Sequence, residues 1–126
     1  MNLNPDSRSS LLTGTAVLAL AVMIGAFGAH GLKSMVSPEK LVTFETGVRY
    51  HFYHGFGLLL LGLYQLHASS KLRLTHWAFL LGILLFSFNC YLYVVTDVKV
   101  FAMIVPVGGA LFILGWGNWF WRLLRS

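Results

Sequence analysis

The sequence predicts an all-α integral membrane protein: an antiparallel bundle of four transmembrane helices, with a short interfacial amphipathic helix between the first and the second. Of its 126 residues, 57% are hydrophobic and only 10% are charged, whereas a soluble domain carries roughly a quarter charged residues. Four stretches contain no Lys, Arg, Asp or Glu, and each reaches the ~20 residues with which a helix crosses a bilayer core of ~30 Å. We interpret residues 1–126 as a single transmembrane domain, with spans at about 11–32, 50–68, 75–96 and 101–121.

The first span also has features of a cleaved signal peptide, because Arg8 precedes its apolar core and small residues lie near its end. Its apolar run is longer than a usual signal-peptide core. The small residues from Gly25 to Ala29 also suit helix packing better than cleavage. We therefore expect the span to be retained.

The interfacial helix is predicted at about 38–48. Ser37 followed by Pro38 and Glu39 is typical of an N-cap, a first-turn proline and an acid favoured by the helix dipole. An apolar face and a charged face follow, made by Leu41, Phe44 and Val48 on one side and by Lys40, Glu45 and Arg49 on the other. Glu45 and Arg49 are spaced for an ion pair. Gly47 would allow a bend before the second span.

The charges favour a topology in which both termini lie in the cytoplasm. Five basic residues fall on the termini side and four on the opposite side. By the positive-inside rule, this excess favours cytoplasmic termini. Trp77, Trp119 and Trp121 fall at the termini side, where an aromatic belt would lie. The net charge of +5 is thus explained by loops and tails, and we expect no nucleic-acid partner.

This topology predicts a polar cluster in the half of the bundle away from the termini, made by His30, His51, His54, Ser87, Asn89 and Tyr91. His30 ends the first span and His51 and His54 begin the second, so the three are expected at one depth. The termini-side half is expected to be apolar, and His67 and His76 beside the loop at Lys71 are expected to be solvated.

Three interpretations of the cluster stay open. The histidines and Asn89 can hydrogen-bond across helices, because buried imidazoles and amides need partners in lipid. They can line a small-molecule or lipid pocket. His30 and His54 can also be ligands of a metal or haem. The sequence leaves cofactors undefined.

Small residues predict close helix packing. The packing candidates are Ala21, Gly25, Gly28, Ala29, Gly55, Gly62, Pro106, Gly108, Gly109 and Gly115. Pro106 is expected to kink the fourth span, because proline removes a helical hydrogen bond. Such a kink could line a cavity beside Asn89.

Catalytic constellations are absent from the sequence. No carboxylate lies within a span, and no Ser/His/Asp arrangement, acid pair or P-loop lysine is present. The lone Cys90 cannot form an intramolecular disulfide. We expect no catalytic residues and no enzyme.

Four ordered motifs stand out in the sequence: Gly25-Ala-Phe-Gly-Ala-His-Gly-Leu32, Tyr50-His-Phe-Tyr-His54, Leu85-Phe-Ser87 with Tyr91, and Pro106-Val-Gly-Gly109 with Phe112, Gly115 and Trp116. They closely resemble the domain-of-unknown-function family 423, which includes the YgdD- and YwdK-like small inner-membrane proteins and a relative of human transmembrane protein 256. The resemblance covers nearly the whole chain and is weaker at His51 and Asn89. It implies a four-helix protein of the bacterial inner membrane and carries no activity.

The function predicted is that of an uncharacterised, non-enzymatic accessory, structural or lipid-interacting membrane protein. Expected partners are the bilayer and a homo-oligomer or larger membrane complex. Two alternatives stay open: a haem or metal binder using His30 and His54, and a small transporter or channel.

Overall fold

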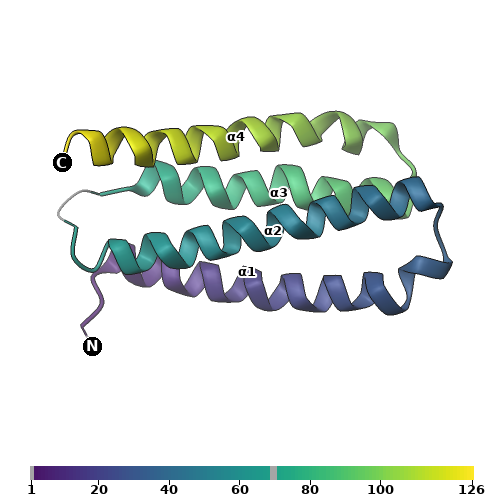
Figure 1. Ribbon diagram of the computed structural model, residues 1–126, viewed down its shortest axis with the longest axis horizontal. Helices are drawn as coiled ribbons and strands as arrows, with labels where there is room; N and C mark the ends of the chain where they lie inside the picture. Colours follow the sequence, from purple (N-terminus) through teal and green to yellow (C-terminus); the bar gives the residue numbers. More distant parts are fainter. Residues whose placement is uncertain (1, 69–70) are drawn as a thin grey trace.

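The computed structural model describes residues 2–68 and 71–126, and within these ranges the fold is entirely helical. The elements are α1 (Pro5–His30), the 3₁₀ turn η1 (Leu32–Ser34), α2 (Pro38–Tyr64), α3 (Arg73–Thr96) and α4 (Lys99–Leu124). The four long helices lie side by side, and each runs opposite to the one before it (Figure 1). The predicted all-α class is therefore confirmed.

Local chemistry explains where the helices start and stop. The Asn4 side chain accepts a hydrogen bond from the Ser7 amide and caps α1, and Ser37 caps α2 as predicted by accepting from the Lys40 amide. Asp97 ends α3 in the left-handed region, with φ of 57°. Its carboxylate bonds the Lys40 ammonium at 2.7 Å, and this bond keeps the pKa of Asp97 below its usual range.

The predicted interfacial helix is not separate from the second span, since both belong to α2. Gly47 lies within this one continuous helix. A Cβ at this position would lie 2.9 Å from the Cβ of Cys90, and the Gly47 carbonyl accepts the Ser87 hydroxyl at 2.7 Å. Gly47 thus lets α3 approach α2 closely.

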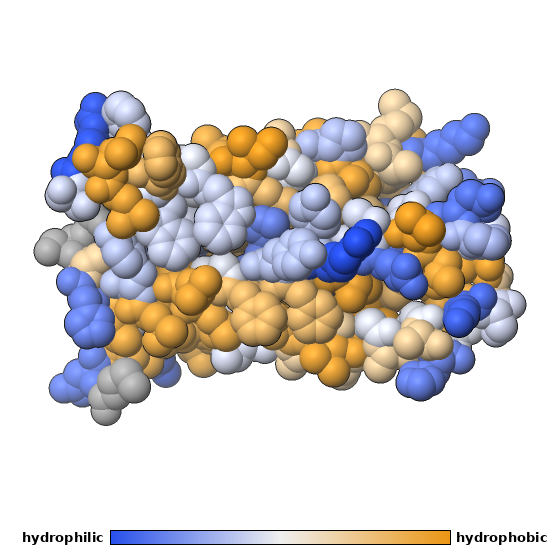
Figure 2. Space-filling view, viewed as in Figure 1, coloured by the Kyte–Doolittle hydropathy of each residue, from blue (hydrophilic) through white to orange (hydrophobic). Residues whose placement is uncertain are grey.

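Three helices, α1, α3 and α4, are long and apolar enough to cross a membrane. The first turns of α2 carry charged residues, including Glu45 and Arg49, which lower its apolar character. On the face drawn in Figure 2, hydrophobic side chains predominate in the middle, where a few hydrophilic ones interrupt them, and hydrophilic side chains gather at both ends. This distribution matches the depth profile of a bilayer.

The helices pack in chain order: α1 on α2, α2 on α3, and α3 on α4. Glycines set the contacts of the outer helices. A Cβ at Gly55 or Gly62 would meet Leu18 or Leu11 of α1 at 2.7 Å, and a Cβ at Gly115 would meet Phe79 of α3 at 2.7 Å. The inner pair α2 and α3 therefore carries most of the core.

The other packing candidates occupy different environments. Ala21 is fully buried, and a Cβ on Gly28 would collide with the Phe44 ring. Gly25 has only an ordinary contact, at 3.4 Å from Val48, and Ala29 is exposed. Among the small residues near the end of α1, the tight contact thus lies at Gly28 rather than at Gly25 or Ala29.

Candidate functional site

His54 uses both of its ring nitrogens, Nδ1 within α2 and Nε2 toward α4. Nδ1 lies 2.8 Å from the Tyr50 carbonyl, and Nε2 lies 3.0 Å from the indole nitrogen of Trp116. A carbonyl only accepts and an indole N–H only donates, so Nδ1 carries the hydrogen and Nε2 the lone pair. The ring also stacks on Phe112, with centroids 3.5 Å apart and planes within 8°. His54 has no lone pair left for a metal in this arrangement.

His51 connects α2 to α3 within the core. It is fully buried, and its Nδ1 lies 2.9 Å from the Tyr91 hydroxyl. Its Nε2 has no hydrogen-bond partner among the described residues. Ser87 donates to the Gly47 carbonyl one turn away. His51, Ser87 and Tyr91 are therefore brought together at the interface of the two inner helices.

The structure separates His30 from the other histidines, so the expectation of a common depth is wrong. His30 is exposed at the end of α1. Its neighbour Gly28 packs on Phe44, which precedes His54 by about ten residues, or roughly 15 Å at ~1.5 Å per residue. The error arises because α2 begins at Pro38, so its first turns rather than Tyr50 pair with the end of α1.

Asn89 forms its hydrogen bonds within α3 rather than with a histidine. Its amide donates to the carbonyls of Leu84 and Leu85 in its own helix, at 3.2 and 3.0 Å. Among the described residues, no three His, Cys, Asp or Glu side chains form a group that could hold a metal ion. Of the predicted cluster, His51, Ser87 and Tyr91 thus share the α2–α3 interface and His54 bonds α4, whereas Asn89 bonds only its own helix.

A polar network lies at the termini end, which the sequence predicted to be apolar. Ser10 bonds Gln65 at 2.9 Å and His76 at 3.0 Å, and Ser7 donates to the Gly62 carbonyl at 2.7 Å. His76 was expected to be solvated but is only 7% exposed, whereas His67 is exposed. The i,i+3 spacing of the two serines on one face of α1 was the available signal.

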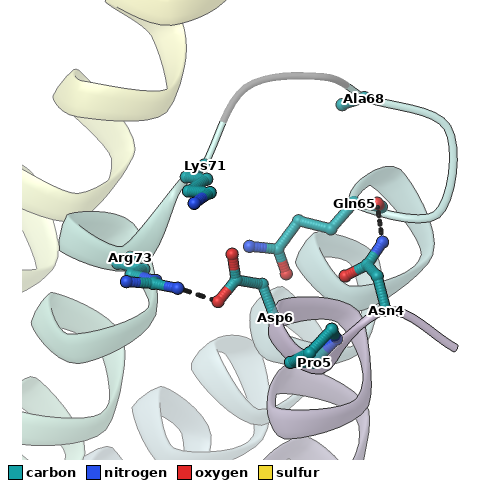
Figure 3. A pocket seen from close by; sticks show the side chains of 7 residues that line it. All are labelled: Asn4, Pro5, Asp6, Gln65, Ala68, Lys71 and Arg73. Atoms are coloured by element: carbon teal, nitrogen blue, oxygen red, sulfur yellow. Dashed lines mark hydrogen bonds and ion pairs between the residues drawn. The ribbon is translucent and has the colours of Figure 1, made fainter.

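The same network continues to the surface of the bundle. Arg73 donates to Asp6 at 2.9 Å, and Asn4 donates to the Gln65 carbonyl at 2.8 Å beside a hollow of about 260 Å³ (Figure 3). On the α4 side, Asn118 donates to the Thr75 hydroxyl at 2.9 Å. These bonds fix the ends of all four helices against one another.

A groove of about 630 Å³ lies between α2 and α4, with Phe86 of α3 contributing to its wall. Its lining is mostly aromatic: Tyr50, Tyr53, His54, Phe86, Pro106, Gly109, Ala110, Phe112, Ile113 and Trp116. His54 and Phe112 are buried at its base, whereas Tyr53 and Ile113 are 56% and 75% exposed at its rim. Side chains with aromatic rings cross the middle of the face in Figure 2.

The groove differs from the cavity predicted beside Asn89. Pro106 lines it, as expected, but Asn89 does not. Ala110 and Ile113 were not among the predicted site residues, and Tyr53 was included only in the motif from Tyr50 to His54. Their signal was the helical spacing by which Ala110 and Ile113 share one face of α4 with Pro106 and Gly109.

Comparison with known proteins places this sequence in a family. Residues 24–109 match the family described as protein of unknown function DUF423. A UPF0382 membrane protein of Staphylococcus aureus (strain bovine RF122 / ET3-1) is 39% identical over 84% of this chain and 87% of its own. The UPF0382 membrane protein YwdK of Bacillus subtilis (strain 168) is 36% identical over 84% of this chain and 88% of its own. The chain belongs to the DUF423 family.

The DUF423 match extends from the last turns of α1 into α4. It includes six of the groove residues, from Tyr50 to Gly109, while Asn4, Ser7 and Ser10 of the termini network precede it. Phe112 and Trp116 lie beyond the matched residues but belong to motifs of the predicted resemblance. No solved structure matches this DUF423 chain.

Proposed function

We propose that this protein crosses the bacterial inner membrane four times, with both termini in the cytoplasm, and binds lipid without catalysing a reaction. Its relatives are named membrane proteins, and three of its helices are long and apolar enough to span a bilayer. The remaining long helix, α2, packs between α1 and α3. It has no charged residue from Tyr50 to Tyr64. The excess of basic residues on the termini side supports the orientation.

The groove between α2 and α4 carries the proposal. Its volume of about 630 Å³ and its aromatic, largely apolar lining suit a hydrocarbon chain. His54 is already satisfied by Tyr50 and Trp116, so the base of the groove offers no free polar group that a chain would have to desolvate. Within the hydrocarbon core of a bilayer, an open groove on the protein surface is in contact with lipid chains.

The concave shape of the groove distinguishes it from an ordinary lipid-facing surface. A hydrocarbon chain on a convex helix face touches protein on one side only, whereas a chain in a groove gains dispersion contacts from two helices. Gly109 and Ala110 keep the α4 wall low, while Tyr53 and Ile113 stand at the rim. We infer that one chain resides here longer than those of the surrounding bilayer.

Filling the groove tests this function. Ala110→Trp places a large ring where an exposed alanine lies, and should reduce the fraction of protein that retains lipid by roughly tenfold, equivalent to about 1.4 kcal/mol. The measurement is native mass spectrometry of protein released from nanodiscs. Leu114→Trp is the matched control, because Leu114 is an exposed α4 residue outside the groove lining.

Equal lipid retention in Ala110→Trp, Leu114→Trp and the wild type would refute the groove as a lipid site. Circular dichroism of the three proteins in the same detergent checks that the helices are intact. Since Ala110 is exposed, its replacement should leave the core unchanged.

The haem and metal alternative receives no support from the geometry, since His30 and His54 lie apart and His54 uses both nitrogens. The transporter alternative relied on Asn89, whose amide is bonded to its own helix. Neither is proposed here as a function.

A further inference from the structure

Two opposite charges lie one turn apart on the outer face of α2. Glu45 and Arg49 are both exposed, and among the described residues they form no ion pair with each other. Arg49 instead turns back along the helix and donates to the Thr46 hydroxyl at 3.2 Å. Strongly hydrophilic side chains interrupt the apolar face over α2 (Figure 2). Charges at such a position in a membrane helix require a partner.

Both charges border a hollow of about 320 Å³ between α1 and α2. Gly25, Gly28 and Ala29 form its α1 side, and their small size leaves the space open. The hollow accordingly combines an apolar wall with one cation and one anion.

The hollow lies just inside the head-group layer opposite the termini, since that layer is only about 5–8 Å thick on each side of a bilayer. Counted from Pro38, Glu45 lies roughly 10 Å and Arg49 roughly 16 Å along α2, at ~1.5 Å per residue. A bilayer is about 40–45 Å thick with head groups and ~30 Å without them. The Arg49 side chain points toward the start of α2, as its bond to Thr46 shows. Its guanidinium therefore reaches toward the head groups by snorkelling.

The hollow adjoins the lipid groove along one ridge of α2. Tyr53 follows Arg49 by one turn on the same helix face and stands at the rim of the groove. A lipid whose head occupies the hollow can therefore lay a chain past Tyr53 into the groove. The head would then lie on the surface side and the chain toward the bilayer centre.

We propose that the hollow binds a phospholipid whose head carries a phosphate and a primary ammonium, that is, a phosphoethanolamine head. This inference rests on the proposed lipid-binding function and names the lipid class. The phosphate accepts hydrogen bonds from Arg49, and the ammonium donates to Glu45. The order is right, because Glu45 lies nearer the membrane surface and the ammonium lies outside the phosphate.

The spacing and the charges both favour this head group. Side chains at i and i+4 are about 5–6 Å apart at Cβ, which suits the short ethanolamine link between the two charged groups. A lipid with only negative charge would place that charge beside the Glu45 carboxylate and meet repulsion. A quaternary ammonium has no N–H to donate to Glu45, so a choline head would be held less well.

The test uses full-length protein in nanodiscs made of equal parts phosphatidylethanolamine and phosphatidylglycerol. Native mass spectrometry should show phosphatidylethanolamine retained in about fivefold excess over phosphatidylglycerol. This ratio corresponds to the free energy of one exposed ion pair. Glu45→Gln should abolish this preference while total lipid retention remains. Arg49→Gln should reduce retention of both lipids, and Arg49→Lys should restore part of it. Glu39→Gln is the matched control, because Glu39 is an exposed acid in the first turn of the same helix.

The outcomes separate this inference from the proposed function. If lipid retention is blocked by Ala110→Trp but shows no head-group preference, the groove binds lipid and the assignment of the head group is wrong. If Ala110→Trp has no effect, the proposed function itself fails. If the Glu45 and Arg49 variants leave lipid unchanged but convert a dimer into monomers, the two charges bind a second copy of the chain and the inference is overturned.

Discussion

Gly108→Ala is expected to destabilise the protein by about 2–3 kcal/mol, the cost of overpacking a tight contact. A Cβ on Gly108 would lie 2.7 Å from the carbonyl carbon of Leu85 and would collide with the backbone nitrogen of Phe86. Backbone cannot rotate away as a side chain does, so α3 and α4 would have to separate. That separation would also move Phe112 from its contact with Gly82.

Gly109→Ala provides the control at the adjacent residue. A Cβ there would lie 3.7 Å from Phe86, which is ordinary contact. Both substitutions gain the same helix propensity, roughly 1 kcal/mol, so the difference between them reports the steric clash. The measurement is the unfolding midpoint in a titration of mixed micelles with sodium dodecyl sulfate. Equal midpoints for the two variants would show that α3 and α4 are not closely packed at Gly108.

His54→Leu is expected to destabilise the protein by about 2 kcal/mol, summing one interhelical hydrogen bond and one aromatic stack. The substitution leaves the indole N–H of Trp116 without its acceptor and removes the ring that stacks on Phe112. It should also loosen α4 on α2, since His54 supplies the hydrogen bond between the two helices at the groove.

A double-mutant cycle with Trp116→Phe isolates this contact. The two substitutions should be less than additive, because either one removes the same hydrogen bond. His30→Leu is the control, and it should have little effect because His30 is exposed at the end of α1. Strict additivity would indicate that His54 and Trp116 do not interact, and a large effect of His30→Leu would contradict the separation of the histidines.

The helices themselves could be predicted from sequence because lipid leaves the chain few alternatives. Long stretches without charged residues, with caps such as Ser37 before Pro38, determine where helices form in any surrounding structure. Hydrogen bonding across helices was one of the three interpretations left open for the histidines, and the bonds of His51 to Tyr91 and of His54 to Trp116 have this form. These predictions depend on local properties of the chain.

The relative offset of the helices could not be predicted in the same way. His30 and His54 were placed at one depth by counting from the ends of apolar runs, whereas α2 starts three turns before its apolar run begins. The termini network was missed for a related reason. Ser10, Gln65 and His76 come from three helices, and each looks like an ordinary surface residue until the packing brings it to the others.

The measurement that tests the lipid groove most directly is covalent labelling by a phosphatidylethanolamine that carries a diazirine in its acyl chain. After irradiation in nanodiscs, adducts should concentrate on peptides that contain Tyr53, Ile113 and Trp116, and Ala110→Trp should suppress them. Val22 and Met103 are equally open to lipid, at 58% and 74% exposed, but lie outside the groove. Adducts spread evenly over these residues and the groove would contradict the account.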